Sequence, residues 1–136
     1  MREKLGRLVA VSILAGASVI GMSGCASESD PAVTTIGAAD LLDVAAGPDV
    51  VVLDVRTPEE YAEGHVPGSI NIDVSGPTFT EDIEALPKDA TYVVYCRSGN
   101  RSAQAASQMA DAGFTDVYDV DAGLETLAEA GVPVTP

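Results

Sequence analysis

The segment YVVYCRSGNRSAQAASQMADAG, which runs from Tyr92 to Gly113, contains the patterns of a strand, a turn and a helix in succession. Tyr92–Tyr95 is an uninterrupted run of β-branched and aromatic residues, which is typical of a strand covered on both faces. Arg101–Ala112 carries small and apolar residues on one helical face, and small side chains let a helix pack closely on a sheet. Cys96 therefore stands at the carboxyl end of a predicted buried strand, where open α/β sheets bind their ligands.

The same alternation of strand and helix patterns extends through residues 33–136. We expect strands at Thr34–Ile36, Val50–Leu53, Ser69–Ile72, Tyr92–Tyr95 and Val117–Val120, and helices at Ala38–Ala46, Pro58–Gly64, Glu81–Leu86, Arg101–Ala112 and Leu124–Ala130. The second helix has the clearest start, because Thr57 can cap it, Pro58 suits the first helical position and Glu60 completes a capping box. This alternation predicts the α/β class, with a mostly parallel sheet and helices on both faces.

The first 25 residues have the pattern of an export signal. Three basic residues precede the apolar stretch Leu8–Met22, which is short for a membrane span. The stretch ends in Met22-Ser23-Gly24-Cys25, which resembles the lipobox of bacterial lipoproteins, where the cysteine is diacylated and becomes the mature N-terminus. Two acyl chains hold a protein stably at a bilayer.

We therefore expect a lipoprotein signal peptide at residues 1–24, a lipidated tether at residues 25–32 that starts at Cys25, and a folded domain at residues 33–136. The expected location is the extracytoplasmic side of the cell membrane, through the lipid anchor. An uncleaved anchor, an ordinary secretory peptide and an intracellular protein are the alternatives.

The charge of the chain limits its partners. The sequence has 21 acidic and 7 basic residues and a net charge of −14. Removal of residues 1–24 takes away three basic residues and one acidic residue, which leaves a net charge of −16. Such a surface argues against nucleic acids and anionic lipid headgroups as partners. With Cys25 acylated, Cys96 has no partner for an intramolecular disulfide.

The loop after the fourth predicted strand combines features that stabilise an anion. Gly99 tolerates positive φ, so the loop can curl and direct successive amides at the Cys96 sulfur. The following helix adds the positive end of its dipole, and Arg97 and Arg101 add two full charges. A cysteine in such surroundings has a lowered pKa and is mainly thiolate at neutral pH. We expect Cys96 to be a nucleophile that needs no separate base.

Two long segments resemble the rhodanese family of sulfurtransferases. Cys96-Arg97-Ser98-Gly99-Asn100-Arg101-Ser102 is similar to the active-site loop of single-domain rhodaneses, and the segment from Leu53 to Ile72 is similar to the family's amino-terminal signature. The resemblance covers Val33–Val134. It implies the rhodanese fold, a five-stranded parallel sheet flanked by helices, and a mechanism in which the cysteine carries a sulfane sulfur as a persulfide.

The resemblance also implies roles for individual residues. Cys96 is the expected catalytic residue, Asp54 and Arg56 are expected to support the site, and the substrate is expected to bind Arg97, Ser98, Gly99, Asn100, Arg101 and Ser102. The expected partners are a small anionic sulfur donor such as thiosulfate and a thiol or cyanide acceptor. No cofactor and no metal ion is expected.

One alternative activity and one departure from the family pattern accompany this interpretation. The related phosphatases separate cysteine and arginine by five residues, whereas four residues intervene here, which favours sulfur transfer. Many family members have Gly-Gly and a following tryptophan where this chain has Ala122-Gly123 and Leu127, so the packing beside the pocket and the substrate choice stay open.

The structural alternative for Asp54 and Arg56 is an ion pair or cap, for example between Arg56 and Glu60, and we favour it over direct catalysis. His65 is expected to be a hydrogen-bonding scaffold residue, not a base. A protein of another class would use the same loop without turnover, as a persulfide- or redox-sensing module of the cell envelope.

Overall fold

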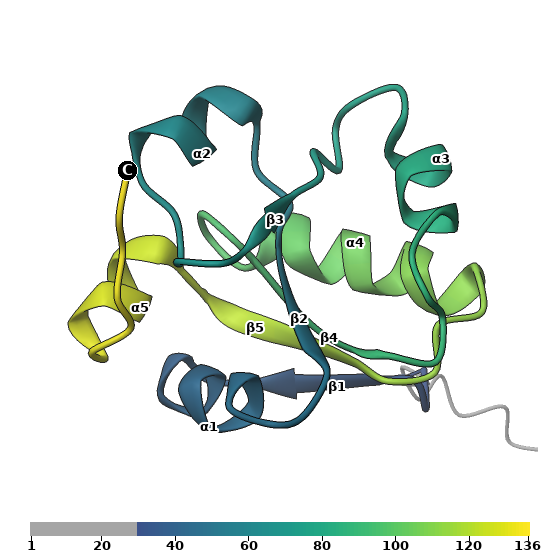
Figure 1. Cartoon of the computed structure of the whole chain (residues 1–136), viewed down its shortest axis with the longest axis horizontal. Helices are drawn as coiled ribbons and strands as arrows, with labels where there is room; N and C mark the ends of the chain where they lie inside the picture. The colour runs from purple at the N-terminus through teal and green to yellow at the C-terminus, as the bar shows by residue number, and fades with distance from the viewer. Residues whose placement is uncertain (1–29) are drawn as a thin grey trace, which may run out of the picture.

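A computed structural model describes residues 30–136 of the chain (Figure 1). The strands are β1 (Val33–Ile36), β2 (Val50–Asp54), β3 (Ile70–Asn71), β4 (Thr91–Cys96) and β5 (Val117–Gly123). The helices are α1 (Leu41–Ala45, after a 3-10 turn at Ala38–Asp40), α2 (Pro58–Glu63), α3 (Phe79–Glu84), α4 (Asn100–Asp111) and α5 (Leu124–Glu129). No helix within this part of the chain is long and apolar enough to cross a membrane.

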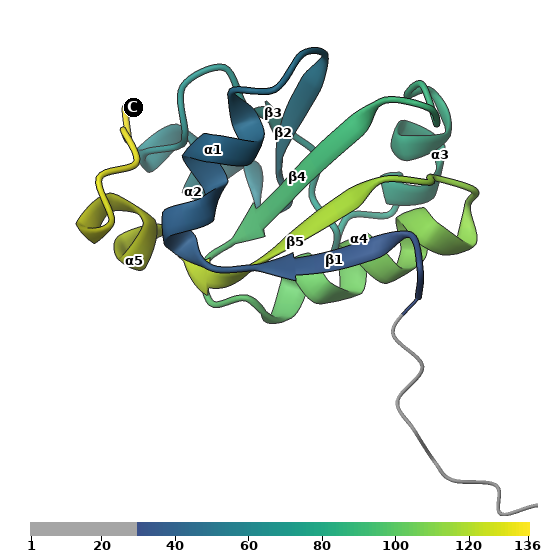
Figure 2. The same ribbon diagram turned by 90° about the horizontal axis from the view of Figure 1, so that it is seen from below.

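The five strands form one parallel sheet in the order β1-β5-β4-β2-β3. Helices α1 and α5 cover one face and α4 covers the other, as the view in Figure 2 shows. The predicted α/β class, the five-stranded parallel sheet and the helices on both faces are therefore confirmed. The predicted signal peptide and all but the last residues of the predicted tether lie outside the described residues.

Strand β4 lies at the centre of the sheet and separates two apolar cores. Its residues alternate between the faces: Tyr92, Val94 and Cys96 belong to the core under α4, and Val93 and Tyr95 belong to the core under α1 and α5. All five have no exposed surface. A strand buried on both faces needs apolar residues at every position, which explains the unbroken run in the sequence.

Several element boundaries differ from the prediction, and the starts of two helices show the physical reason. Helix α3 begins at Phe79, two residues before the predicted start, because Phe79 and Ile83 are buried in the core under α4. The first predicted helix opens as a 3-10 turn before α1. The predicted capping box of α2 is confirmed: the Glu60 amide donates to Thr57 Oγ1 at 3.3 Å, and the Thr57 amide donates to Glu60 Oε2 at 3.1 Å.

Gly123 brings the end of β5 unusually close to the loop after β4. The β4–β5 register shifts between Val94 and Cys96, so that Cys96 lies opposite Gly123. A Cβ atom at Gly123 would lie 1.8 Å from the Arg97 carbonyl oxygen, a separation that atoms cannot adopt. Leu127 of α5 is fully buried in the core under α1 and α5.

Gly123→Ala should lower the free energy of unfolding by about 1–3 kcal/mol, the range of overpacking substitutions. The new methyl group would overlap the Arg97 carbonyl and force the loop away from β5. Urea unfolding of the two proteins measures the difference. Gly37→Ala is the matched control, since the nearest atom to its Cβ is 3.5 Å away, and it should cost less than about 1 kcal/mol. Equal stabilities of wild type and Gly123→Ala would show that the loop is not held by this contact.

Candidate active site

Cys96 ends β4 and its sulfur lies inside the loop that follows. Gly99 adopts φ +87, and this left-handed turn directs its amide back to the sulfur, with 3.0 Å between the nitrogen and Sγ. Ser102 Oγ lies 3.6 Å from the same sulfur. The loop therefore has the inward-facing amide expected from the sequence. The Cys96 residue has 0% exposed surface, so apolar side chains and the loop together enclose it.

Two opposing effects set the pKa of the Cys96 thiol. Burial, the larger single effect, raises the pKa because it disfavours the charged form. The hydrogen bond with the Ser102 side chain and those from the amides of Ser102, Ser98 and Gly99 lower it. Together these hydrogen bonds outweigh burial, and the pKa of Cys96 lies below its ordinary value. The loop thus favours the thiolate, the nucleophilic form of cysteine.

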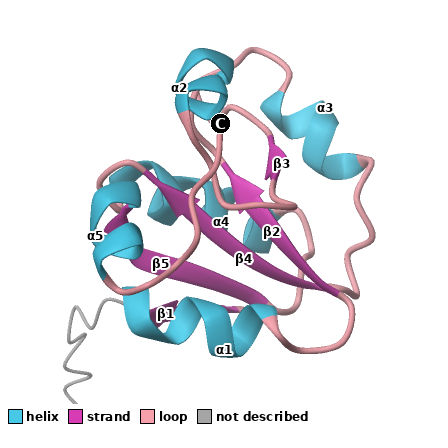
Figure 3. Cartoon of the chain, turned by 60° about the vertical axis from the view of Figure 1, so that its left-hand side comes forward, coloured by secondary structure: helices cyan, strands magenta, loops and turns pink. Residues whose placement is uncertain are grey.

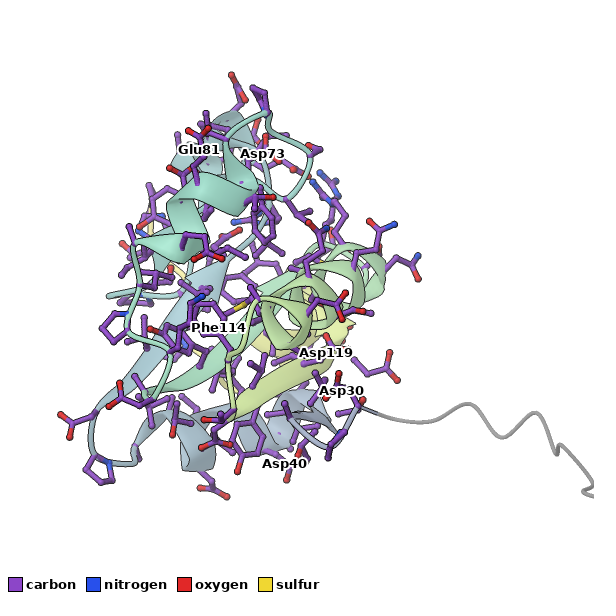
Figure 4. The ribbon with its side chains drawn as sticks, turned by 90° about the vertical axis from the view of Figure 1, so that its right-hand side faces the viewer. Asp30, Asp40, Asp73, Glu81, Phe114 and Asp119 are labelled. Atoms are coloured by element: carbon purple, nitrogen blue, oxygen red, sulfur yellow. The ribbon has the colours of Figure 1, made fainter. Side chains whose placement is uncertain are left out.

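Ser102, in the first turn of α4, ties the loop to β5. Its buried hydroxyl lies 3.0 Å from the Gly99 carbonyl oxygen and 3.3 Å from that of Val120, so it connects the loop, α4 and β5. Asp119 lies on β5 beside α4 and is 6% exposed (Figure 4). Burial raises the pKa of its carboxyl group, and a hydrogen bond with Ser102 partly offsets that rise. Sequence analysis overlooked Asp119, although an acidic residue inside a predicted buried strand is a usable signal.

Arg101 is held by a carboxylate of another element. Its guanidinium donates to both carboxylate oxygens of Glu60, at 2.7 and 2.9 Å, and so joins α4 to α2. Arg97 Nη1 lies 3.6 Å from Glu60 Oε1, and the Arg97 side chain is 65% exposed. The hydrogen bond from Arg101 is the main reason that the pKa of Glu60 falls to about 2. Glu60 is therefore ionised at any physiological pH.

Asp54 and Arg56 form the expected structural ion pair, but the partner of Arg56 is Asp54 and not Glu60. Arg56 Nη2 lies 2.6 Å from Asp54 Oδ2 and donates to the Gly64 carbonyl oxygen at 2.6 Å. The Tyr95 hydroxyl donates to Asp54 Oδ2 at 2.6 Å. Burial would lower the pKa of Arg56, but its hydrogen bond with Asp54 and the Asp54 charge raise it. This pair holds the end of α2 against the sheet.

The remaining predicted residues lie around the loop. Ser98 and Asn100 are exposed, and Asn100 is the first residue of α4. His65 Nδ1 lies 2.9 Å from the Tyr61 carbonyl oxygen, and its ring stacks on that of Tyr61 with 3.7 Å between centroids, as expected of a scaffold residue. Within residues 30–136, no group of three or more His, Cys, Asp or Glu side chains could hold a metal ion.

A cavity of about 230 Å³ lies beside the loop, at the carboxyl end of the sheet. The C-terminal segment returns past α5 to this end, where Thr135 pairs with His65 (Figure 3). The lining residues are Arg56, Glu60, Glu63, Gly64, Arg97, Leu124, Glu125 and Val134. Cys96 is not among them, and it has no exposed surface.

Known proteins share both the sequence and the fold. Residues 37–130 match the rhodanese-like domain model. The chain is 38% identical to a chloroplastic thiosulfate sulfurtransferase of Arabidopsis thaliana, over 60% of this chain and 76% of that protein. It is 41% identical to the thiosulfate sulfurtransferase GlpE of Pseudomonas fluorescens, over 55% of this chain and 67% of that protein.

Solved structures agree with these sequence relatives. A rhodanese-related protein of Thermoplasma volcanium superposes with a TM-score of 0.65 at 38% identity, over 74% of this chain and 96% of that one. A rhodanese-like domain protein of Staphylococcus aureus gives a TM-score of 0.64 at 25% identity, over 76% and 99% of the two chains. Because the family model matches residues 37–130 and the relatives agree with it, the chain belongs to the rhodanese-like domain family.

Proposed function

We propose that this protein is a sulfurtransferase that carries sulfur as a persulfide on Cys96. The Cys96 thiolate attacks the outer sulfur of a donor such as thiosulfate, a new S–S bond forms, and the donor's S–S bond breaks. Sulfite leaves with the bonding electron pair. A thiolate or cyanide acceptor then attacks the terminal sulfur of the persulfide, which releases the Cys96 thiolate.

One observation carries this proposal: the Gly99 amide donates to a buried Cys96 sulfur whose pKa lies below its ordinary value. A buried cysteine without such donors is an inert apolar residue with a raised pKa. The relatives that are named thiosulfate sulfurtransferases support the same chemistry. The amides that stabilise the thiolate are also suited to the transferred sulfur, which keeps a negative charge.

The donor is a small anion in this proposal, and Arg97 and Arg101 attract it. Arg97 has the more accessible side chain, whereas Arg101 is ion-paired with Glu60. Both charges lie near the loop, and surface charges farther away are screened over roughly 8 Å at physiological ionic strength. Local arginines therefore dominate over the distant acidic groups. Exposed acidic residues such as Asp30, Asp40 and Glu81 lie on the outer surface of the molecule (Figure 4).

A second candidate function is a persulfide- or redox-sensing module without turnover. The lowered pKa of Cys96 supports it, because a sensing cysteine also needs a stabilised thiolate. Both functions use the same thiolate, and they differ in whether the persulfide is passed on catalytically.

We also propose that the domain works on the extracytoplasmic side of the cell membrane, anchored by lipid at Cys25. The basic start, the apolar stretch and the small residues before Cys25 support this proposal.

Incubation with thiosulfate should add one sulfur atom to Cys96, because the reaction requires only that the loop keep Cys96 as a thiolate. Mass spectrometry of the peptide that contains Cys96 measures the addition, and Cys96→Ser should show none. Sulfite in place of thiosulfate is the negative control. The activity is ruled out if Cys96 gains no sulfur and both proteins turn over cyanide equally. Sulfur loading without turnover to any thiol or cyanide would favour the sensing module.

The alkylation rate of Cys96 should begin to fall only at a pH below the ordinary pKa of a cysteine thiol. The reason is that the hydrogen-bonded thiolate persists to lower pH than a free one. Ser102→Ala removes the side-chain hydrogen bond that lowers the pKa of Cys96 and should move the inflection to higher pH. Iodoacetamide rates across pH measure both profiles. Ser98→Ala is the control, since its side chain is exposed and its amide remains. An ordinary alkaline profile in the wild type would contradict a stabilised thiolate.

Expression of the full chain in a bacterial host should yield a lipid-modified protein in the membrane fraction. Cys25→Ser should abolish the lipid mass, and globomycin should block processing of the precursor. Cys96→Ser should leave both unchanged. Processing that resists globomycin and ignores Cys25 would refute the anchor.

A further inference from the structure

Glu60 occupies the place at which the two loop arginines could together hold an anion. Its carboxylate receives two hydrogen bonds from Arg101 and lies 3.6 Å from Arg97 Nη1. The Glu60 side chain is 18% exposed and fixed further by the Thr57 amide. We call Glu60, Arg97 and Arg101 the Glu60 clamp. An anionic ligand that bridges both arginines must displace this carboxylate.

The cavity beside the loop is not a cationic pocket in this state. Glu60 and Arg97 both line it, so the clamp forms part of its wall. Of its two arginines, Arg56 is committed to Asp54 and Arg97 lies beside Glu60. Two more carboxylates, Glu63 and Glu125, line the same cavity. An approaching dianion therefore meets three carboxylates, whereas an uncharged donor meets no such opposition.

We propose that Glu60 is a specificity-determining residue, whose carboxylate competes with anionic donors for Arg97 and Arg101 and favours uncharged sulfur carriers. This inference rests on the proposed function, because it assumes that Cys96 is the reacting group. Thiosulfate remains a substrate in this scheme, but it binds only at the cost of opening the clamp. The protonated, uncharged form of an organic persulfide, R–S–SH, can react with the arginines still paired. The Cys96 thiolate bonds to its outer sulfur, the S–S bond of the donor breaks, and the thiolate R–S⁻ leaves with the bonding electrons. Glu60 influences which donor binds, and it leaves the sulfur-transfer reaction at Cys96 unchanged.

Two alkylating reagents of nearly equal shape test the inference without sulfur transfer. Iodoacetate is anionic and iodoacetamide is neutral, and both react with the same Cys96 thiolate. The ratio of their rates cancels the thiolate fraction and the accessibility of the sulfur, so it reports the effect of reagent charge. The full chain is used, and mass spectrometry of the Cys96 peptide distinguishes this thiol from any other.

Glu60→Gln should raise the iodoacetate-to-iodoacetamide ratio by about tenfold, because both arginines then face the reagent without a carboxylate between them. Glutamine retains an oxygen that can accept the Thr57 amide, so α2 keeps its cap. Glu63→Gln is the matched control, since it removes the same charge from the same cavity without touching the loop arginines. It should change the ratio by less than about twofold.

Glu60→Asp provides a second test that leaves the net charge unchanged. The shorter side chain cannot span both arginines, so the ratio should rise here too; this variant decides the question if Glu60→Gln does not fold. The inference is overturned if neither variant raises the ratio beyond twofold, or if Glu63→Gln raises it equally. Failure of sulfur loading on Cys96 would refute the proposed function separately, whatever the ratio shows.

Discussion

The hydrogen bond from the Gly99 amide to the Cys96 sulfur is the interaction on which the site depends. A sulfur without exposed surface is neutral unless donors inside the protein replace water. Three local constraints place these donors around the sulfur. Gly99 turns the chain with a positive φ, Ser102 ties the loop to β5, and Gly123 leaves room for the Arg97 carbonyl. Each constraint acts on backbone position, so the loop is set by geometry before any charged side chain contributes.

Charge therefore has a different role in this site from the one that the sequence suggests. The groups that lower the pKa of Cys96 most are the Ser102 hydroxyl and backbone amides, and the arginine charges are shared with Glu60. The acidic surface of the protein has little influence on the sulfur, because screening limits its range and the interior donors are only a few ångströms away. A strongly acidic chain can hold a thiolate for this reason, and net charge alone is a poor guide to the chemistry of a buried group.

Local patterns made much of the fold and part of the site predictable from the sequence. The run Tyr92–Tyr95 marked the central strand because burial on both faces leaves no polar position, and Gly99 marked the turn because few other residues tolerate its backbone. The partner of Arg101 was missed, since Glu60 lies 41 residues away and the pairing depends on how α2 packs. The start of α3 was missed because burial of Phe79, a tertiary contact, decided it. The steric need for Gly123 also became visible only with the loop in place.

The segment between β2 and β3 is polar because polar contacts attach its helix, α2, to the rest of the domain. The helix has only six residues and none is buried, so apolar packing does not hold it to the sheet. Polar contacts hold it instead. Arg56 binds the carbonyl at its end, the Tyr61 hydroxyl donates to the Ser69 carbonyl at 2.7 Å, and Glu60 binds Arg101. Because Glu60 Oε2 accepts from Thr57 and from Arg101 at once, one carboxylate both caps α2 and fixes the start of α4. The loop and α2 cannot shift independently, and any ligand that takes Arg101 from Glu60 also loosens the helix that lines the cavity.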